Sequence, residues 1–338
     1  MLEDNSDLSY NLPTDLKTVN SIDGAMRPKS FAEYVGQQNL VDQLQMMIGS
    51  AKKREVVLDH ILFYGLPGTG KTTLAQIVAS EMNANIVVTS GQALEKTGDV
   101  AAILASIKAG DILFIDEIHR LKPKVEELLY TAMEDFVIDM VLGKGPTAKV
   151  IRLDLPPFTL LGATTKLHSL ANPLKDRFGI VLKIAEYEES DILNILRSNT
   201  AKMQIEVDTL ALELLSKCSR GTPRLANHFL KRARDFLVHE SKSKLTYEMA
   251  AGLLAQMGID EYGLNEQDRK LINKIYYDFD SGPVGLSTLA AALNDDPDTM
   301  QELFEPYLMR LGFLKRSHRG RVLTDKGIEF VKNYGKVV

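Results

Sequence analysis

A short glycine-rich run has the composition and spacing of a phosphate-binding loop: residues 65–72 read Gly-Leu-Pro-Gly-Thr-Gly-Lys-Thr. Its glycines allow the backbone to wrap a triphosphate with N–H groups pointing inward, and a following helix adds the positive end of its dipole. Lys71 is then placed to reach the β- and γ-phosphate oxygens, and the Thr72 hydroxyl to bind Mg²⁺. A glycine turn with a chance lysine is the alternative, but the apolar run before the loop and the helix-forming residues after it favour a nucleotide site.

Two neighbouring carboxylates end the apolar run Ile112–Ile115. At the end of a buried strand, Asp116 and Glu117 are costly without a partner, and Mg²⁺ supplies one. Asp116 then holds the metal, directly or through water, while Glu117 polarises the attacking water. A pair of surface acids is the alternative for these residues taken alone. Together with the phosphate loop, they predict hydrolysis of a nucleoside triphosphate rather than binding alone.

Three further polar side chains are candidates for the same site. Thr164 follows an apolar strand, so it sits at the sheet edge of the phosphate loop and can sense the γ-phosphate; an ordinary loop threonine is the alternative. Arg224 follows the helix-starting pair Thr222-Pro223, and a cation in a first helical turn indicates a nearby anion, either the γ-phosphate or a carboxylate. Tyr187 either lines a nucleotide cleft between domains or belongs to the core.

Arg177 and His119 carry weaker signals. Arg177 can be an arginine finger that serves a neighbouring subunit, although an ordinary surface ion pair explains it as well. His119 closely follows the two acids and invites a metal-ligand interpretation, but the six histidines show no ligand spacing. We therefore expect His119 to be a local hydrogen-bonding residue.

The elements that must position these residues alternate between strands and helices. Apolar runs predict strands near 60–64, 85–89, 111–115, 158–162 and 179–184. The helical spacing of other apolar residues predicts helices from residue 39, over 71–82 and 100–107, and around 125–133. This alternation predicts an α/β fold in which helices cover both faces of a parallel sheet.

Beyond residue 184 the strands stop. Residues 190–257 have the pattern of four helices, and 257–263 is the expected linker. Helices are then predicted near 266–279, near 286–293 and from Asp296-Pro297 onward, followed by a hairpin around the polar turn 316–320. Three helices and a hairpin predict a winged helix. The predicted division is a tail at 1–25, an ATPase domain at 26–183, a helical domain at 184–256 and a winged helix at 257–338.

The C-terminal region is basic in an acidic chain. Residues 311–338 hold seven Lys or Arg against Asp325 and Glu329, a local balance of +5, whereas the whole chain carries −5. A charge cluster is usually a solvated face, but on a winged helix it favours contact with nucleic-acid phosphates. No base-reading pattern is evident, so we expect sequence-neutral binding.

A second hairpin is predicted inside the ATPase domain. Two β-rich runs, Phe136–Leu142 and Lys149–Leu155, flank a Gly/Pro turn between the strand of the paired acids and that of Thr164. This hairpin should project from the sheet and expose one apolar face, which consists of Ile138, Met140 and Leu142. Exposed apolar side chains at a tip usually mark a partner site, and packing on the ATPase domain is the alternative.

Length and composition set the broader limits. With 338 residues the chain is too long for one ordinary core, and 45% hydrophobic with 25% charged residues is typical of a globular protein. Cys218 is the only cysteine, which excludes an internal disulfide and suits a reducing compartment. The acidic, polar N-terminus is unlike a signal peptide, and no apolar run reaches membrane-spanning length. We therefore expect a cytoplasmic protein with no membrane contact.

In combination, these motifs resemble the RuvB family of AAA+ ATPases, the bacterial motors of Holliday-junction branch migration. The resemblance covers nearly everything from Met26 to Thr324. The segments that carry it are 27–29, 65–73, 93–99, 114–121, 132–136, 154–159, 162–165, 219–224, 282–285 and 305–321. It implies an AAA+ domain, a small helical lid and a winged helix.

The resemblance also implies partners and site residues. It implies a hexameric ring on duplex DNA that uses ATP and Mg²⁺ in recombination and repair. It also implies that RuvA binds through hairpin 136–155, by residues such as Met140 and Leu142, and that RuvC resolvase joins a larger complex. Arg177 matches the family's trans-acting arginine, and Arg316, Arg319 and Arg321 match its basic wing. The residues implied around the nucleotide are Met26, Arg27, Gly68, Thr69, Gly70, Lys71, Thr72, Thr73, Glu134, Asp135, Phe136, Arg177, Tyr187 and Arg224.

Three other functions compete with a DNA translocase. A clamp loader or initiator-type switch would bind DNA and use ATP without processive movement. A protein remodeller is disfavoured because the basic wing is present and an aromatic–hydrophobic–glycine pore loop is missing. A non-catalytic DNA-binding protein with a degenerate nucleotide site is disfavoured because Lys71 and Glu117 are both present.

Overall fold

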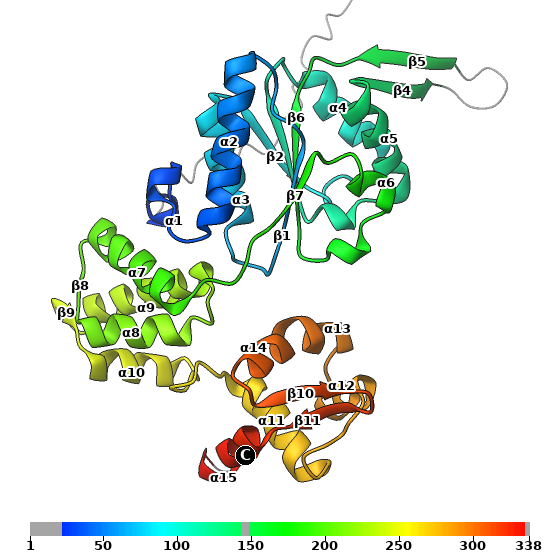
Figure 1. Ribbon diagram of the computed structural model, residues 1–338. Coiled ribbons are helices and arrows are strands. Elements are labelled where there is room, and N and C mark those ends of the chain that lie inside the picture. The colour runs from blue at the N-terminus through cyan, green and yellow to red at the C-terminus, as the bar shows by residue number, and fades with distance from the viewer. Residues whose placement is uncertain (1–21, 143–148, 335–338) are drawn as a thin grey trace, which may run out of the picture. The chain divides into compact units, whose positions relative to one another are not determined.

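The computed structural model describes residues 22–142 and 149–334 (Figure 1). The described chain forms two units, one made of residues up to 204 together with 222–227, and the other of 205–221 together with 228 onward. Each unit has its own arrangement of helices and strands. Within the described residues, no helix is both long and apolar enough to cross a membrane.

A five-stranded parallel sheet forms the centre of the first unit, with the strand order β2-β3-β6-β1-β7. Ile61 pairs with Leu161 on one side and with Ile180 on the other, and Tyr64 pairs with Thr164. Because all the strands run the same way, their carboxyl ends share one edge. The parallel sheet predicted from the alternating elements is confirmed. The strands are β1 (Ile61–Tyr64), β2 (Ile86–Ser90), β3 (Ile112–Asp116), β6 (Thr159–Thr164) and β7 (Ile180–Lys183).

Helices cover both faces of this sheet (Figure 1). On one face α2 (Gln38–Arg54) and α3 (Lys71–Met82) pack against the buried side chains of Phe63 and Phe114. On the other face the core includes Phe158 and residues of α4 (Thr97–Ser106), α5 (Pro123–Glu134) and the short α6 (Asn172–Lys175). Each fully buried aromatic or branched side chain contributes roughly 1.5–3 kcal/mol, so these two cores hold the strand ends in place.

The hairpin formed by β4 (Val137–Leu142) and β5 (Lys149–Asp154) pairs Ile138 with Leu153 and Met140 with Ile151. Ile138 is fully buried in the core beneath α5, so the prediction that it is exposed with its neighbours was wrong. The base of the hairpin is therefore anchored in the domain. Ile151 and Leu153 remain 48% and 36% exposed. The side chains of Met140 and Leu142, and the turn 143–148, lie outside the described residues.

The four helices predicted after the sheet are present. They are α7 (Glu189–Met203), α8 (Thr209–Cys218), α9 (Pro223–His239) and α10 (Tyr247–Gln256). In the second unit a small parallel pair, β8 (Glu206–Val207) with β9 (Lys244–Leu245), joins the segments before α8 and α10. Strands of two residues have no periodicity, and the sequence did not reveal them.

The winged helix in the second unit differs from the predicted pattern in two places. The helix expected from Asp296 is divided into α13 (Pro297–Thr299), a π-helical turn at Met300–Phe304 and α14 (Glu305–Arg310). A further helix, α15 (Asp325–Tyr334), was not predicted; it buries Phe330 and Val331 behind the hairpin. The remaining elements are α11 (Glu266–Asp278), α12 (Leu286–Leu293), β10 (Leu314–Ser317) and β11 (Gly320–Leu323).

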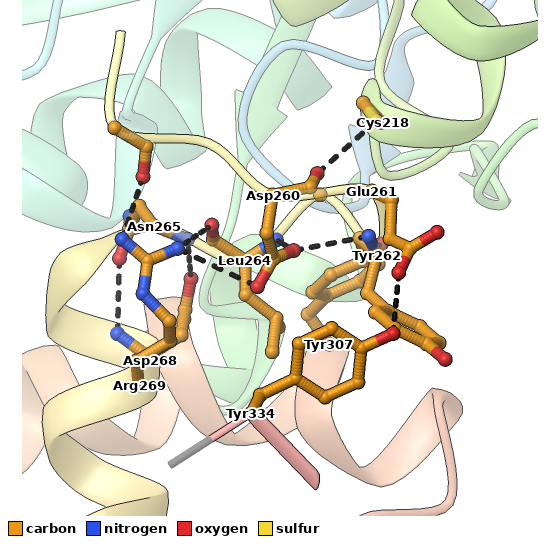
Figure 2. Close-up of polar contacts among 12 residues, drawn as sticks. Cys218, Asp260, Glu261, Tyr262, Leu264, Asn265, Asp268, Arg269, Tyr307 and Tyr334 are labelled. Carbon is orange, nitrogen blue, oxygen red and sulfur yellow. Dashed lines mark hydrogen bonds and ion pairs between the residues drawn. The ribbon is translucent and has the colours of Figure 1, made fainter. Parts of the chain in front are cut away.

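The segment predicted as a linker is tied down by hydrogen bonds, as Figure 2 shows. Asp260 accepts hydrogen bonds from the backbone N–H groups of Tyr262 (3.0 Å) and Leu264 (2.8 Å). Arg269 donates to the carbonyl oxygens of Leu264 (2.8 Å) and Gly258 (2.9 Å). The linker is therefore an ordered part of the second unit.

A buried ion pair lies beside that linker. The guanidinium of Arg220, just after α8, binds the carboxylate of Asp268 on α11 and also donates to the carbonyl of Gly263 (2.9 Å). Asp268 is fully buried, and burial raises the pKa of its carboxyl, whereas Arg220 acts to lower it. Gly263 has a φ of +72°, and a Cβ there would lie 2.9 Å from the Tyr307 hydroxyl. The end of α8 and the start of α11 are thus joined by close contacts.

Candidate nucleotide-hydrolysis site

The phosphate-binding loop lies between β1 and α3, at the carboxyl edge of the sheet. Lys71 is buried and donates from Nζ to the carbonyl oxygens of Gly65 and Leu66, at 2.9 Å each. Burial lowers the pKa of the Lys71 ammonium, while the carboxylates of Asp116 and Glu117 act in the opposite direction. The cation is therefore held inside the loop, where phosphate oxygens would bind.

The loop needs glycine where it closely approaches the residues at the start of α9. Gly68 has a φ of +79°, and a Cβ there would lie 2.8 Å from the Thr222 side chain and 2.9 Å from that of Arg224. The N–H of Arg224, in the first turn of α9, donates to the Gly68 carbonyl at 3.4 Å. Arg224 is exposed and lies beside the phosphate loop. Of the two anions proposed for it from the sequence, this position favours the γ-phosphate.

Asp116 ends β3 directly across from the loop. Its Oδ2 accepts a hydrogen bond from the Thr72 hydroxyl at 3.2 Å, and its Oδ1 accepts one from the N–H of Glu117 at 2.9 Å. A hydroxyl and a carboxylate are oxygen ligands of the kind that Mg²⁺ prefers. In the part of the chain that the structure describes, no group of three or more His, Cys, Asp or Glu residues is placed to hold a metal. A pair of oxygen ligands from Thr72 and Asp116 fits Mg²⁺, which usually keeps several waters and phosphate oxygens among its ligands.

Glu117 follows with a φ of +49°, which turns the chain back at the end of the strand. Its carboxylate lies 3.5 Å from Nε2 of His119 and 3.4 Å from Nε of Arg120, and its side chain is about one-third exposed. The carboxylate is thus open on one side and held by two neighbours on the other. This arrangement suits a group that must orient a water molecule.

Thr164 ends β6, between the strand of Asp116 and the strand that enters the phosphate loop. It is fully buried, and its hydroxyl accepts a hydrogen bond from the N–H of Lys166 at 3.0 Å and lies 2.9 Å from Nδ1 of His119. The prediction that His119 is a hydrogen-bonding residue is confirmed, although its partner Thr164 is not local in sequence but lies on β6. The loop, the paired acids and Thr164 thus meet at one edge of the sheet, as the sequence predicted.

Tyr187 lies beside the loop together with a residue that the sequence did not single out. The Tyr187 hydroxyl donates to that of Tyr34 at 2.7 Å, and a Cβ on Gly70 would lie within 4 Å of both oxygens. Burial raises the pKa of Tyr34 to about 12, so its hydroxyl stays protonated. Met26, which ends α1 (Ile22–Met26), is buried, and Arg27 is exposed. The one signal in the sequence that could have singled out Tyr34 as a buried residue was its spacing of three residues from Phe31.

Arg177 is surrounded by partners from its own chain. Its guanidinium pairs with Glu134 at 2.8 Å, donates to the carbonyls of Tyr130 (3.3 Å) and Pro173 (2.9 Å), and lies 4.8 Å from the centre of the Tyr130 ring. Arg177 and Glu134 also line a cleft of about 350 Å³. The surface ion pair proposed as the alternative therefore exists.

Arg177 and three other residues predicted around the nucleotide lie away from the phosphate loop of the same chain. Phe136 packs against the rings of His60 and Phe158, which precede β1 and β6, and Arg177 precedes β7. These positions are at the amino edge of the parallel sheet, opposite the edge that carries the loop. Glu134, Asp135, Phe136 and Arg177 thus lie at the sheet edge opposite the phosphate loop of their own chain.

Two of the three wing arginines share an internal partner. Glu305 is fully buried and accepts from Arg316 (2.8 Å to Nε) and from Arg321 (2.6 Å to Nε). The Arg321 side chain is only 14% exposed, so its predicted role as a phosphate contact conflicts with its burial. Arg316 is 43% exposed, and Arg319 is exposed at the turn. The sequence feature that could have revealed the contacts of Arg316 and Arg321 was Glu305, an acid within an otherwise apolar helical stripe.

The fold and the site define a P-loop ATPase of the AAA+ class. Three family models match the chain in succession: the Holliday junction DNA helicase RuvB P-loop domain over residues 26–184, the RuvB AAA lid domain over 187–260 and the RuvB C-terminal winged helix domain over 261–332. The chain belongs to the RuvB family, and it is accordingly an ATP-hydrolysing enzyme.

Individual relatives match over nearly their full length. The Holliday junction branch migration complex subunit RuvB of Fusobacterium nucleatum is 48% identical over 321 residues, which cover 94% of this chain and 97% of that protein. Among solved structures, the Thermotoga maritima RuvB Holliday junction branch migration motor matches with a TM-score of 0.82 and 44% identity, over 91% of this chain and 98% of that one. A single-residue mutant of the same RuvB matches with a TM-score of 0.83.

Proposed function

We propose that this chain uses ATP to drive branch migration of Holliday junctions, as a hexameric ring on duplex DNA that acts with RuvA in recombination and repair. The observation that carries the proposal is a hydrolysis site assembled at one sheet edge in a chain that also ends in a winged helix. The clamp-loader or initiator alternative has the first of these features in common, but the match to branch-migration relatives runs through all three domains. We place these domains at 26–183, 184–256 and 257–338, in the cytoplasm.

The residues of the site divide the work of hydrolysis. The loop N–H groups and Lys71 hold the β- and γ-phosphates, and Thr72 with Asp116 would hold Mg²⁺, which supplies positive charge to the phosphate oxygens when bound. Glu117 orients the attacking water and accepts its proton, and Thr164 and Arg224 contact the γ-phosphate. The remaining proposed nucleotide contacts are Met26, Arg27, Gly68, Thr69, Gly70, Thr73 and Tyr187.

We propose the hairpin as the surface that binds RuvA. We take its apolar face to be the one that carries the partly exposed Ile151, because Ile151 is paired with Met140 across the antiparallel strands and Leu142 follows two residues further along the same strand. Asp139 and Arg152 pair on the other face through two hydrogen bonds of 2.8 Å each. The two faces thus differ in chemistry and can be tested separately. RuvC would join the same assembly as a further component.

Charges introduced on the apolar hairpin face should abolish RuvA binding. We expect Met140→Asp with Ile151→Asp to weaken RuvA binding by at least about tenfold, because an apolar contact would have to bury two carboxylates. ATP turnover and bare-DNA binding should stay unchanged. Titration of each variant with RuvA measures the effect, and Arg152→Ala on the opposite face is the matched control. Loss of basal ATPase activity in the double variant would show that this face belongs to the core.

Substitution of two wing arginines should have different effects, because Arg319 is proposed to contact DNA and Arg321 stabilises the winged helix. Arg319→Ala should weaken duplex binding about equally across sequences and flatten the salt dependence by roughly one unit, as expected for one lost phosphate contact. Arg321→Ala should mainly destabilise the winged helix, by about 3–5 kcal/mol, because it leaves buried Glu305 less well compensated. Salt titrations of DNA binding and thermal unfolding of the full chain measure the two effects. An unchanged salt slope for Arg319→Ala would move the DNA contact elsewhere.

The proposed function as a whole is tested by the partner that accelerates ATP turnover. Duplex DNA should stimulate hydrolysis, and DNA with RuvA should in addition convert a four-way junction into two duplexes. Stimulation by DNA without strand exchange would favour a clamp-loader or initiator switch. Stimulation by unfolded protein instead of DNA would favour a remodeller.

A further inference from the structure

His119 joins two residues whose roles are otherwise separate. It lies in the short turn Ile118–Arg120 that begins when the positive φ of Glu117 reverses the chain after β3. Because β6 is the neighbouring strand, this turn brings the His119 ring to the end of β6. The ring is 7% exposed, with Nδ1 2.9 Å from the Thr164 hydroxyl and Nε2 3.5 Å from the Glu117 carboxylate.

The hydrogen-bonding capacities of the three groups favour one placement of their protons. A carboxylate can only accept, so the nitrogen that faces Glu117 fits best as N–H. A neutral imidazole that carries its proton on Nε2 leaves Nδ1 as an acceptor, and the Thr164 hydroxyl can donate to it. That hydroxyl has one proton and already accepts from the N–H of Lys166. In this arrangement the only proton of Thr164 is given to His119.

We infer that His119 is a positioning residue that makes the orientation of Glu117 depend on what Thr164 binds. When the Thr164 hydroxyl donates to a γ-phosphate oxygen, its hydrogen bond to Nδ1 of His119 is lost, which changes how the ring beside Glu117 is held. Glu117 is thereby oriented for water activation when the terminal phosphate is present. This inference rests on the roles proposed above for Glu117 and Thr164.

The geometry separates this role from simple packing. Asparagine at position 119 would place an amide near the site of Nδ1 and reach Thr164 alone, whereas glutamine would place it near the site of Nε2 and reach Glu117 alone. A link that needs both ends fails in both variants. If His119 only fills space or binds a single partner, then either asparagine or glutamine should substitute for it and restore turnover.

The test compares ATP affinity with turnover. We expect His119→Ala to lower kcat at saturating ATP and duplex DNA by at least about tenfold, with the affinity for a fluorescent non-hydrolysable ATP analogue within about twofold of the unchanged protein. His119→Asn and His119→Gln should each remain at least about fivefold slow. His168→Ala, an exposed histidine of the same unit, is the control. Full turnover in the asparagine or glutamine variant, or equal losses of affinity and turnover, would overturn the inference.

A double-mutant cycle with Thr164→Val adds a second readout. If the link begins at Thr164, His119→Ala should cost little further turnover in the Thr164→Val background, so the two effects are not additive. Fully multiplicative losses would contradict the link. Should His119→Ala not fold, His119→Asn replaces it in the same cycle. Normal turnover in Glu117→Gln would refute the proposed role of Glu117 itself, whereas an inactive Glu117→Gln with normal His119 variants would refute only this inference.

Discussion

Glu117→Gln is expected to bind ATP normally and to lose turnover by at least about a hundredfold, the usual range for removal of a general base. The amide keeps the size of the side chain but no longer takes a proton from water. The pair of Thr72 and Asp116 is untouched, because Glu117 reaches Asp116 only through its backbone N–H. ATP turnover with duplex DNA and retention of ATP on the isolated protein measure the two effects.

Glu95→Gln is the matched control for that substitution. Glu95 is an exposed acid in the same domain, whose contact with Lys122 at 3.9 Å is weak. It should leave turnover unchanged. If Glu117→Gln hydrolyses ATP within about twofold of the unchanged protein, another group must activate the water.

Arg177→Ala should bind ATP but lose hydrolysis by about a thousandfold, the lower limit for an arginine finger. Its place at the amino edge of the sheet, away from its own phosphate loop, requires that any contact with a phosphate be made to a neighbouring subunit. Mixing Arg177→Ala subunits with Lys71→Ala subunits should therefore restore part of the turnover, since each supplies what the other's interface needs. Turnover of the mixture, compared with that of each variant alone, measures the rescue.

Two controls sharpen the mixing experiment. Arg197→Ala, an exposed arginine on α7, should show neither loss nor rescue. Arg177→Lys keeps a cation beside Glu134 but not the planar fork of donors, so it should stay slow if the arginine acts on a phosphate. Absence of rescue in rings shown to contain both variants would argue that Arg177 acts only within its own chain.

The central sheet and the hydrolysis site were predictable because their signals are local. The predicted bounds of α3, 71–82, agree with the structure, since apolar spacing and the glycine loop fix both ends within one segment. The convergence of Asp116, Glu117 and Thr164 also followed from sequence, because parallel strands bring their carboxyl ends to one edge. For these elements, the local sequence pattern and the topology of a parallel sheet are enough to predict the structure.

The features that were missed depend on contacts between distant residues. Charge counting assigned Arg321 to DNA, but a single buried carboxylate, Glu305, holds it inside the winged helix. Exposure on the hairpin was predicted by alternation, yet Ile138 is buried because α5 passes over the base of the hairpin. Similarly, nothing near Tyr34 indicates that it meets Tyr187 across more than a hundred residues of sequence.

The ordered linker limits how far this protein can be treated as a set of interchangeable modules. A fragment ending near residue 257 would lack Asp268 and leave the Arg220 guanidinium without that carboxylate. It would also remove Tyr307, which packs against the linker beside Gly263. A chimaera that takes only its winged helix from a relative would divide these contacts between two sequences. Exchanging 205–221 together with 228–334 would instead carry both sides of the joint into the new protein.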